Sequence, residues 1–461
     1  MNEPNELPPT VVAGETSVLP LELDRSYPLI VAGDGVWFER ADGERYLDAM
    51  SGGSMAATLG LRRPDLATAA AEQAARVSFV HNERLTNPAQ EQLAAELADL
   101  APGDLSRVQF VTGGAEANEA ALRLARSFHV ERGEGDRWQV ISPAQAYHGP
   151  TMATLALTGR PGLHGAFGPY LSNHLHIPPA SWRFDPTGEA ALAALDAALA
   201  DAGPGNVSAF YCEAISAAAL PAYSPPDRFW EGLAERRDEH GFLICVDEIV
   251  TGMGRTGTWF ASERLPFVPD MIATAKGLGA GHAAIGALIC REHVAEAIAS
   301  GSGRLPLGHT WNGAPLSCAV GLAVIDALRR ERLIERVAER GAELREQLER
   351  ALAGIAMVRE VRGHGFLLGV EYVDPRDRDA LLDPGLGVAG RIDDAALRRG
   401  LVTLSTQPTG DGYAGDQSLF APAFVATDEE LDEMVDRFSA AVAEVAAEID
   451  GELGKDVGAA A

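Results

Sequence analysis

Lysine is almost missing from this sequence. Lys and Arg together number 38 in the 461 residues, and only Lys276 and Lys455 of these are lysines. Lys455 belongs to the small-residue C-terminal stretch GELGKDVGAAA, so Lys276 is the single lysine in the body of the chain. Arginine supplies positive charge but keeps its proton, whereas a desolvated lysine can become a neutral, nucleophilic amine. The exception at position 276 therefore indicates amine chemistry, rather than one more charged side chain at the end of a strand.

Cysteines are few and far apart. Four occur in the chain, and no CxxC pair is found among them. A zinc site or a disulfide framework is therefore not expected, and we predict buried free thiols in a reducing compartment. These residues are Cys212, Cys245, Cys290 and Cys318.

The sequence also lacks the features of a secreted, membrane or nucleic-acid-binding protein. The N-terminal MNEPNELPPT has neither the basic nor the apolar region of a secretory signal, and no apolar run is long enough to span a bilayer. A formal net charge of −28 argues against a general binder of nucleic acid or anionic membranes. We therefore expect a cytoplasmic protein with small-molecule partners.

Alternating patterns along the chain predict the fold class. Between about residues 64 and 300, helical patterns alternate with short β-rich runs, which is typical of a doubly wound α/β domain. The strands are expected at 107–112, 137–142, 207–213, 242–248 and 270–275.

Three regions of the chain are predicted from this change in pattern. We expect an N-terminal arm and hairpin over residues 1–63, packed against the smaller domain, and a large α/β domain over 64–312. Long Arg/Glu-rich helices and short strands then predict a small α+β domain over 313–461.

Two carboxylates follow the predicted strand FLICV. Asp247 and Glu248 would lie at the carboxyl end of the strand, where α/β sheets bind ligands. The glycines of GMGRTG, residues 252–257, match GxGxxG literally, but they neither follow the strand directly nor open a helix. Because the intervening carboxylates would also repel a pyrophosphate, a nicotinamide-dependent oxidoreductase is only a remote alternative.

A phosphate site is predicted where FVTGGAEANEAALRLAR passes from strand to helix. The turn at Gly113, Gly114 and Ala115 would present backbone N–H groups and the helix dipole to an anion. A tight βα turn that needs glycine is the structural alternative.

In AYHGPT, Tyr147 and His148 follow another strand, where an aromatic ring either caps the core or stacks on a flat ligand.

Taken together, these features match the needs of one cofactor. Pyridoxal 5'-phosphate requires a lysine for a Schiff base, an acid on the pyridinium nitrogen, a phosphate cradle and a stacking face. Lys276, Asp247, the turn at Gly114 and the ring of Tyr147 supply that set.

The motifs VDEIVTGMGRTG, PDMIATAKGLGAG and GHTWNGAPLSCAVGLAV carry a family resemblance over nearly the whole chain. The sequence resembles a class III aminotransferase of the pyridoxal-phosphate fold type I. The resemblance implies Lys276 as the Schiff-base lysine and proton-transfer base, Asp247 on the pyridinium nitrogen, and Ile249 and Tyr147 on opposite ring faces. It further implies a homodimer with shared active sites, in which Thr310 binds the phosphate of the neighbouring subunit.

The remaining cofactor residues depart in part from the family pattern. Glu213 takes the place of a polar residue near the cofactor, but alanine follows it where the family has proline. Gly113 and Ala115 flank the phosphate glycine where serine is usual, so only backbone N–H groups are offered there. No arginine precedes the strand APAF; the region has Gly412 and Tyr413 instead. The group that binds a 2-oxo acid carboxylate is thus open, with Arg160 and Arg84 as candidates.

The resemblance implies transfer of an amino group from a primary amine or ω-amino acid to a 2-oxo acid, with pyruvate expected. An aminomutase or racemase of the same fold would share every cofactor residue. The pocket mouth would include Met55, Asn82, Glu83 and Trp311. A polar or cationic donor would suit Glu83, unless that carboxylate simply pairs with an arginine.

Overall fold

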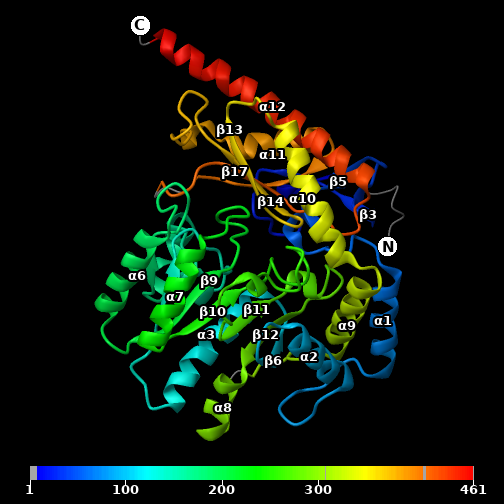
Figure 1. The fold of residues 1–461 in the computed structure, drawn as a ribbon. Coiled ribbons are helices and arrows are strands. Elements are labelled where there is room, and N and C mark those ends of the chain that lie inside the picture. The colour runs from blue at the N-terminus through cyan, green and yellow to red at the C-terminus, as the bar shows by residue number, and fades with distance from the viewer. Residues whose placement is uncertain (1–7, 307, 409–411, 460–461) are drawn as a thin grey trace.

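The computed structural model describes residues 8–306, 308–408 and 412–459. A large seven-stranded sheet lies below two four-stranded sheets (Figure 1). All four cysteines are free and buried, as predicted. Among the described residues, no helix combines the length and the apolar character needed to cross a bilayer.

The large sheet is mixed, because one of its strands runs against its neighbours. Strand β12 pairs antiparallel with both β11 and β6, whereas the other pairings are parallel. The order is β6 (Leu105–Val111), β12 (Gly286–Arg291), β11 (Met271–Thr274), β10 (Leu243–Asp247), β9 (Val207–Glu213), β7 (Gln139–Pro143) and β8 (Leu175–Ile177).

Helices cover both faces of this sheet, which confirms the doubly wound fold class. Alternate residues of β9 face opposite ways: Phe210 packs in one apolar cluster with α6 and α7, and Tyr211 in another with α3. These helices are α3 (Gly114–Glu131), α6 (Glu189–Ala202) and α7 (Asp227–His240). The other helices of this region are α1 (Pro64–Arg76), α2 (Pro88–Leu100), α4 (Met152–Leu157), α5 (Pro161–His164), α8 (Glu292–Ser300) and α9 (Pro315–Arg330).

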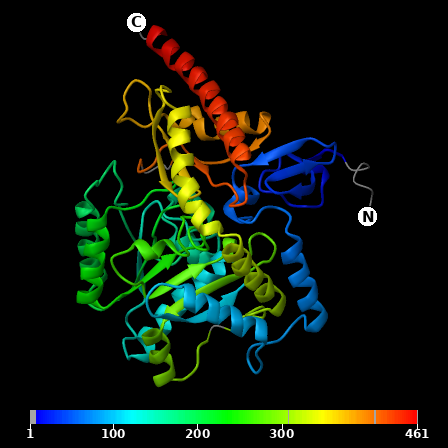
Figure 2. The same cartoon turned by 45° about the vertical axis from the view of Figure 1, so that its right-hand side comes forward.

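The C-terminal elements lie over one edge of the large sheet, beside the N-terminal strands (Figure 2). An antiparallel sheet has the order β13 (Val358–His364), β14 (Leu367–Tyr372), β17 (Gln417–Phe420) and β16 (Leu404–Thr406). Its helices are α10 (Leu333–Ala351), α11 (Val388–Arg398) and α12 (Asp428–Ala459).

The N-terminal hairpin is joined directly to the C-terminal part of the chain. Strand β15 (Leu401–Val402) pairs in parallel with β5 (Arg45–Asp48), which continues through β4 (Trp37–Arg40) to β3 (Ile30–Asp34). A separate ribbon pairs β1 (Thr10–Val12) with β2 (Ser26–Pro28).

Candidate active site

Three neighbouring strands bring their carboxyl ends to one cavity. Asp247 is in register with Glu213 on β9 and with Ala273 on β11, and Lys276 follows β11 by two residues. A cavity of about 330 Å³ opens there, within the range of about 300–1,000 Å³ usual for small-molecule sites. It is lined by nine of the residues predicted from the sequence: Gly113, Gly114, Ala115, Tyr147, His148, Glu213, Asp247, Ile249 and Lys276.

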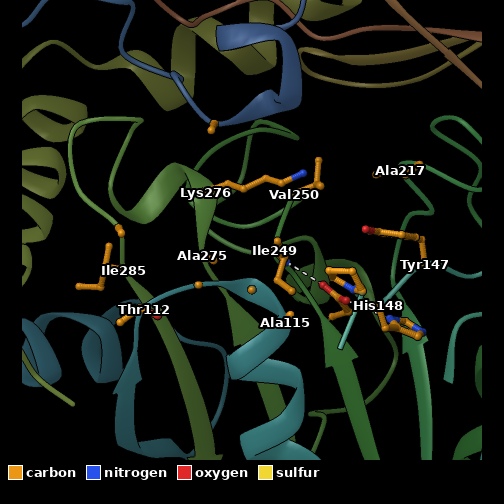
Figure 3. A pocket seen from close by; sticks show the side chains of 18 of the residues that line it. Thr112, Ala115, Tyr147, His148, Ala217, Ile249, Val250, Ala275, Lys276 and Ile285 are labelled. Carbon is orange, nitrogen blue, oxygen red and sulfur yellow. Dashed lines mark hydrogen bonds and ion pairs between the residues drawn. The ribbon is translucent and has the colours of Figure 1, made fainter. Parts of the chain in front are cut away.

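The Lys276 side chain extends across the middle of this cavity toward Val250 (Figure 3). Burial is the main cause that lowers the pKa of its amine to about 8, and the charge of Arg255 adds to the effect, whereas Asp247 and Glu213 oppose it. The Lys276 backbone has a φ of 36°, in the left-handed region that residues other than glycine rarely adopt. Such a conformation costs free energy, and it occurs here at the amine that the sequence singles out.

The Asp247 carboxylate is held by three hydrogen-bond donors. Its Oδ2 accepts from Asn118 Nδ2 at 2.8 Å and pairs with His148 Nδ1 at 2.9 Å, and its Oδ1 accepts from the Ile249 N–H at 3.0 Å. Asn118 is itself fixed, because its amide oxygen accepts from the Tyr211 hydroxyl at 2.5 Å. Asn118 was not predicted from the sequence, although it lies in the stretch EANEAA, one helical turn beyond the phosphate turn.

The N-terminus of α3 forms the lower wall of the cavity, where Figure 3 shows Ala115, with Thr112 farther to the left. Gly114 is required by close approach: a Cβ there would lie 2.8 Å from Ile249 Cδ1. Thr112, also missed, lines the cavity and donates its backbone N–H to Glu116 Oε2 at 2.7 Å. Backbone N–H groups at a helix N-terminus suit an anion such as a phosphate.

Tyr147 and Ile249 project into the cavity from different elements (Figure 3). Burial raises the pKa of the Tyr147 phenol, while the charge of Arg160 acts in the opposite direction. Arg160 is thus within electrostatic reach of the cavity, whereas Arg84 lies exposed outside it. Burial also raises the pKa of the Glu213 carboxyl, to about 7.

Five predicted residues lie outside this cavity in the single chain. Thr310, Asn82 and Glu83 line a different cavity of about 540 Å³. Met55 is 2 % exposed and belongs to an apolar core cluster. Trp311 is 52 % exposed, with its ring edge-on to Phe79 at 5.4 Å. The roles of all five stay predictions, and those of Thr310, Asn82, Glu83 and Trp311 require a second subunit.

Packing gives the GxGxxG stretch a structural explanation. A Cβ on Gly254 would lie 2.9 Å from Ile334, and one on Gly257 would lie 2.8 Å from Ala338, both on α10. These glycines therefore let α10 approach the turn closely. Glu248 also faces away from the cavity, accepting from the backbone N–H groups of Ala261 at 2.9 Å and Ser262 at 2.6 Å.

Comparison with known proteins defines the family. Residues 23–442 match the model of the class-III aminotransferases, and the chain belongs to that family. It is 32 % identical over 430 residues to the uncharacterized aminotransferase YodT of Bacillus subtilis, covering 92 % of this chain and 97 % of that one. It is 30 % identical over 416 residues to a putrescine–pyruvate aminotransferase of Pseudomonas aeruginosa, covering 88 % of each.

Solved structures agree with this assignment. An (S)-enantioselective ω-transaminase from Thermomicrobium roseum superposes with a TM-score of 0.86 at 34 % identity, covering 94 % of this chain and 98 % of that one. An amine transaminase from an uncultivated Pseudomonas species, solved in its PLP-bound form, gives 0.83 at 31 % identity over 90 % and 95 %. The fold is therefore that of the fold type I PLP transferases, and the protein is a class III aminotransferase that uses pyridoxal 5'-phosphate.

The residues of the cavity fit this cofactor. The cavity offers a carboxylate fixed by three donors, a buried amine with a lowered pKa, a helix N-terminus and an aromatic face. The close contact between Gly114 and Ile249 keeps the helix N-terminus near the wall against which a flat ring would lie.

Proposed function

We propose that this enzyme moves an amino group from a primary amine or ω-amino acid to a 2-oxo acid, with pyruvate as the acceptor. The observation that carries the proposal is the buried Lys276 amine, with its pKa of about 8, in the same cavity as the Asp247 carboxylate. The relatives named for putrescine–pyruvate and ω-amino transfer support the choice of donor and acceptor.

Lys276 acts as the base in this proposal. With a pKa of about 8, its Nζ takes up and returns a proton near neutral pH without a large energetic cost. When bound, pyridoxal phosphate supplies a ring that accepts electron density from the carbon bearing the amino group.

The other residues of the cavity position the reacting groups. Asn118 and His148 hold Asp247 Oδ2, and this carboxylate would bind the ring nitrogen of the cofactor. The backbone N–H groups of Gly114 and Ala115, which line the cavity, would bind the phosphate, and Tyr147 and Ile249 would confine the ring on its two faces.

Replacing Lys276 by alanine tests the central assignment. The variant should lose amino transfer from the donor to pyruvate and the visible absorbance of the lysine-bound cofactor. Borohydride treatment of the wild-type holoenzyme should attach the cofactor to the peptide that contains Lys276. Activity retained by the alanine variant would refute the assignment.

An aminomutase or racemase is the second candidate, because it would use the same cofactor residues. The two are separated by alanine formation from pyruvate, which only an aminotransferase gives.

We further propose that Arg160 binds the carboxylate of the acceptor, because its charge reaches the Tyr147 phenol. Loss of pyruvate affinity in Arg160→Leu, but not in Arg84→Leu, would support it.

We also propose that the enzyme works as a homodimer, in which Thr310 completes the site of the partner subunit. Asn82, Glu83 and Trp311 would then border that same site. Mixed dimers of Lys276→Ala and Thr310→Ala chains test this, because one of their two sites would keep both residues. Activity above that of either variant alone is expected, and no gain would contradict the sharing of the site.

Cytoplasmic location and the domain boundaries at residues 63 and 312 stay sequence-based proposals.

A further inference from the structure

One wall of the cavity is a loop that the C-terminal sheet holds in place. This loop, residues 214–222, follows β9 and is called here the wall loop. Its Ala217 and Ala218 line the cavity. Figure 3 shows Ala217 above Tyr147, on the side toward which Lys276 extends. The small side chains of this loop therefore face the space next to the reacting amine.

The wall loop is tied at one end to the large sheet. The Ala217 N–H donates to Glu213 Oε1 at 3.1 Å, and the Ser216 N–H donates to the Tyr223 carbonyl at 2.8 Å. These bonds close the loop on itself, but they do not fix how far its middle projects over the cavity.

Contacts from the C-terminal sheet fix the middle and the far end. Thr406, at the end of β16, donates its hydroxyl to the Ala218 carbonyl at 2.8 Å. Arg362, on β13, donates its Nε to the Pro221 carbonyl at 2.9 Å. The sheet also packs closely on the loop, because a Cβ on Gly369 would lie 2.2 Å from the Pro221 carbonyl oxygen.

Both anchors are themselves held firmly. Thr406 is 6 % exposed, and its register partner is Gln417 on β17. The Arg362 guanidinium pairs with Glu371 at 2.7 Å and with Glu360 at 2.5 Å. The partly buried bond from the Thr406 hydroxyl to the Ala218 carbonyl therefore couples the position of the loop to that of the sheet.

We propose that Thr406, supported by Arg362, is a positioning residue that sets the distance of Ala217 and Ala218 from the reacting amine. Thr406 thereby determines the size of the substituent on the amine-bearing carbon of the donor that the cavity can accept. The inference rests on the proposed amine transfer and deepens it. Neither anchor is placed in contact with the cofactor, so both act through the wall loop.

Thr406→Val tests this, because it keeps the shape of the side chain and removes the donor. Thr406→Ser restores the hydroxyl, and Thr403→Val is the matched control. The Thr403 hydroxyl bonds Asp393 at 2.7 Å, in the same part of the fold. The ratio of KM for isopropylamine to KM for 1-phenylethylamine, with pyruvate as acceptor, should change roughly fivefold to tenfold in Thr406→Val alone. The cofactor absorbance should remain.

Hydrogen–deuterium exchange of the holoenzymes gives a readout independent of turnover. Amides of residues 214–222 should exchange faster in Thr406→Val than in wild type, Thr406→Ser or Thr403→Val. Unchanged exchange would overturn the positioning role. Faster exchange with an unchanged KM ratio would overturn the link to donor size. If the wild type transferred no amino group from either amine, both the proposed function and the proposed donor selectivity would fail. The hydrogen–deuterium exchange would still decide whether Thr406 positions the wall loop.

Discussion

Replacing Asn118 by leucine should lower both the catalytic rate and the stability of the fold. Leucine has a similar volume but no donor, so Asp247 Oδ2 loses a hydrogen bond of 2.8 Å. Hydrogen bonds to charged groups contribute about 1.5–3 kcal/mol. If that interaction matters chiefly while charge develops on the ring, kcat/KM for amino transfer falls roughly 10- to 100-fold.

Stability should fall as well, because the Tyr211 hydroxyl would lose its acceptor inside the core. An unpaired buried hydroxyl costs about 1–3 kcal/mol. Tyr211→Phe is the matched control, since it removes that hydroxyl and leaves the bond between Asn118 and Asp247.

The assay is alanine formation from pyruvate at saturating cofactor, together with thermal unfolding of each holoenzyme. Asn118→Leu should lose kcat/KM strongly, and Tyr211→Phe should lose less than about fivefold. A folded Asn118→Leu variant with kcat/KM within twofold of wild type would refute the role given to the amide. Equal losses in both variants would indicate that the damage comes from the core and not from the carboxylate.

Three further predictions concern the amine, the phosphate turn and the C-terminal sheet. In the half-reaction with pyruvate the Lys276 amine is free, and its neutral form is the base. The rate of this half-reaction should therefore rise as pH increases through about 8 and then level off. Stopped-flow absorbance measures this rate, and a rate that does not change with pH would contradict the prediction. Gly114→Ala should weaken cofactor binding at least tenfold, because the added Cβ would clash with Ile249. Gly113→Ala should leave binding unchanged, because the space around its Cβ is open. Equilibrium titration of each apoenzyme with the cofactor compares the two variants. Burial raises the pKa of Asp416 from 3.8 to about 6, so the wild type loses stability as pH rises through that window and Asp416→Asn does not. In urea unfolding the variant should gain about 3 kcal/mol at pH 8 and nothing below pH 4.

The residues nearest the strand ends could be predicted from sequence because parallel strands deliver their carboxyl ends to one edge. Lys276, Asp247 and Glu213 each follow a short apolar run, and in the fold they line one cavity. The pattern TDEE is likewise typical of a helix start, and Thr427 and Glu430 form a capping box there, with backbone-to-side-chain distances of 2.9 and 3.2 Å. Both signals are local, so neither required knowledge of what packs against the segment.

Contacts between distant segments could not be read in the same way. Asn118 and Asp247 are 129 positions apart, and nothing in EANEAA indicates that this amide meets the carboxylate. The strand in GALIC was not predicted either: β12 runs antiparallel in an otherwise parallel sheet, and its apolar sequence fits either direction. Thr406 is a comparable case, because its contact with Ala218 joins the C-terminal sheet to the wall loop.

Two carboxyl groups in register on neighbouring strands take different roles because their donors differ. Asp247 has an amide, an imidazole and a backbone N–H directed at it, and these stabilise a charged carboxylate. Glu213 accepts from the Ala217 N–H at 3.1 Å and the Ser216 hydroxyl at 3.3 Å, and burial raises its pKa to about 7. The Glu213 carboxyl, with its pKa of about 7, is thus partly protonated at neutral pH, while Asp247 is the carboxyl whose oxygens are held by donors from three sides. Ala217 begins the part of the wall loop that faces the cavity. The partly protonated Glu213 carboxyl therefore lowers the negative charge near Lys276 and also anchors the surface that a donor contacts.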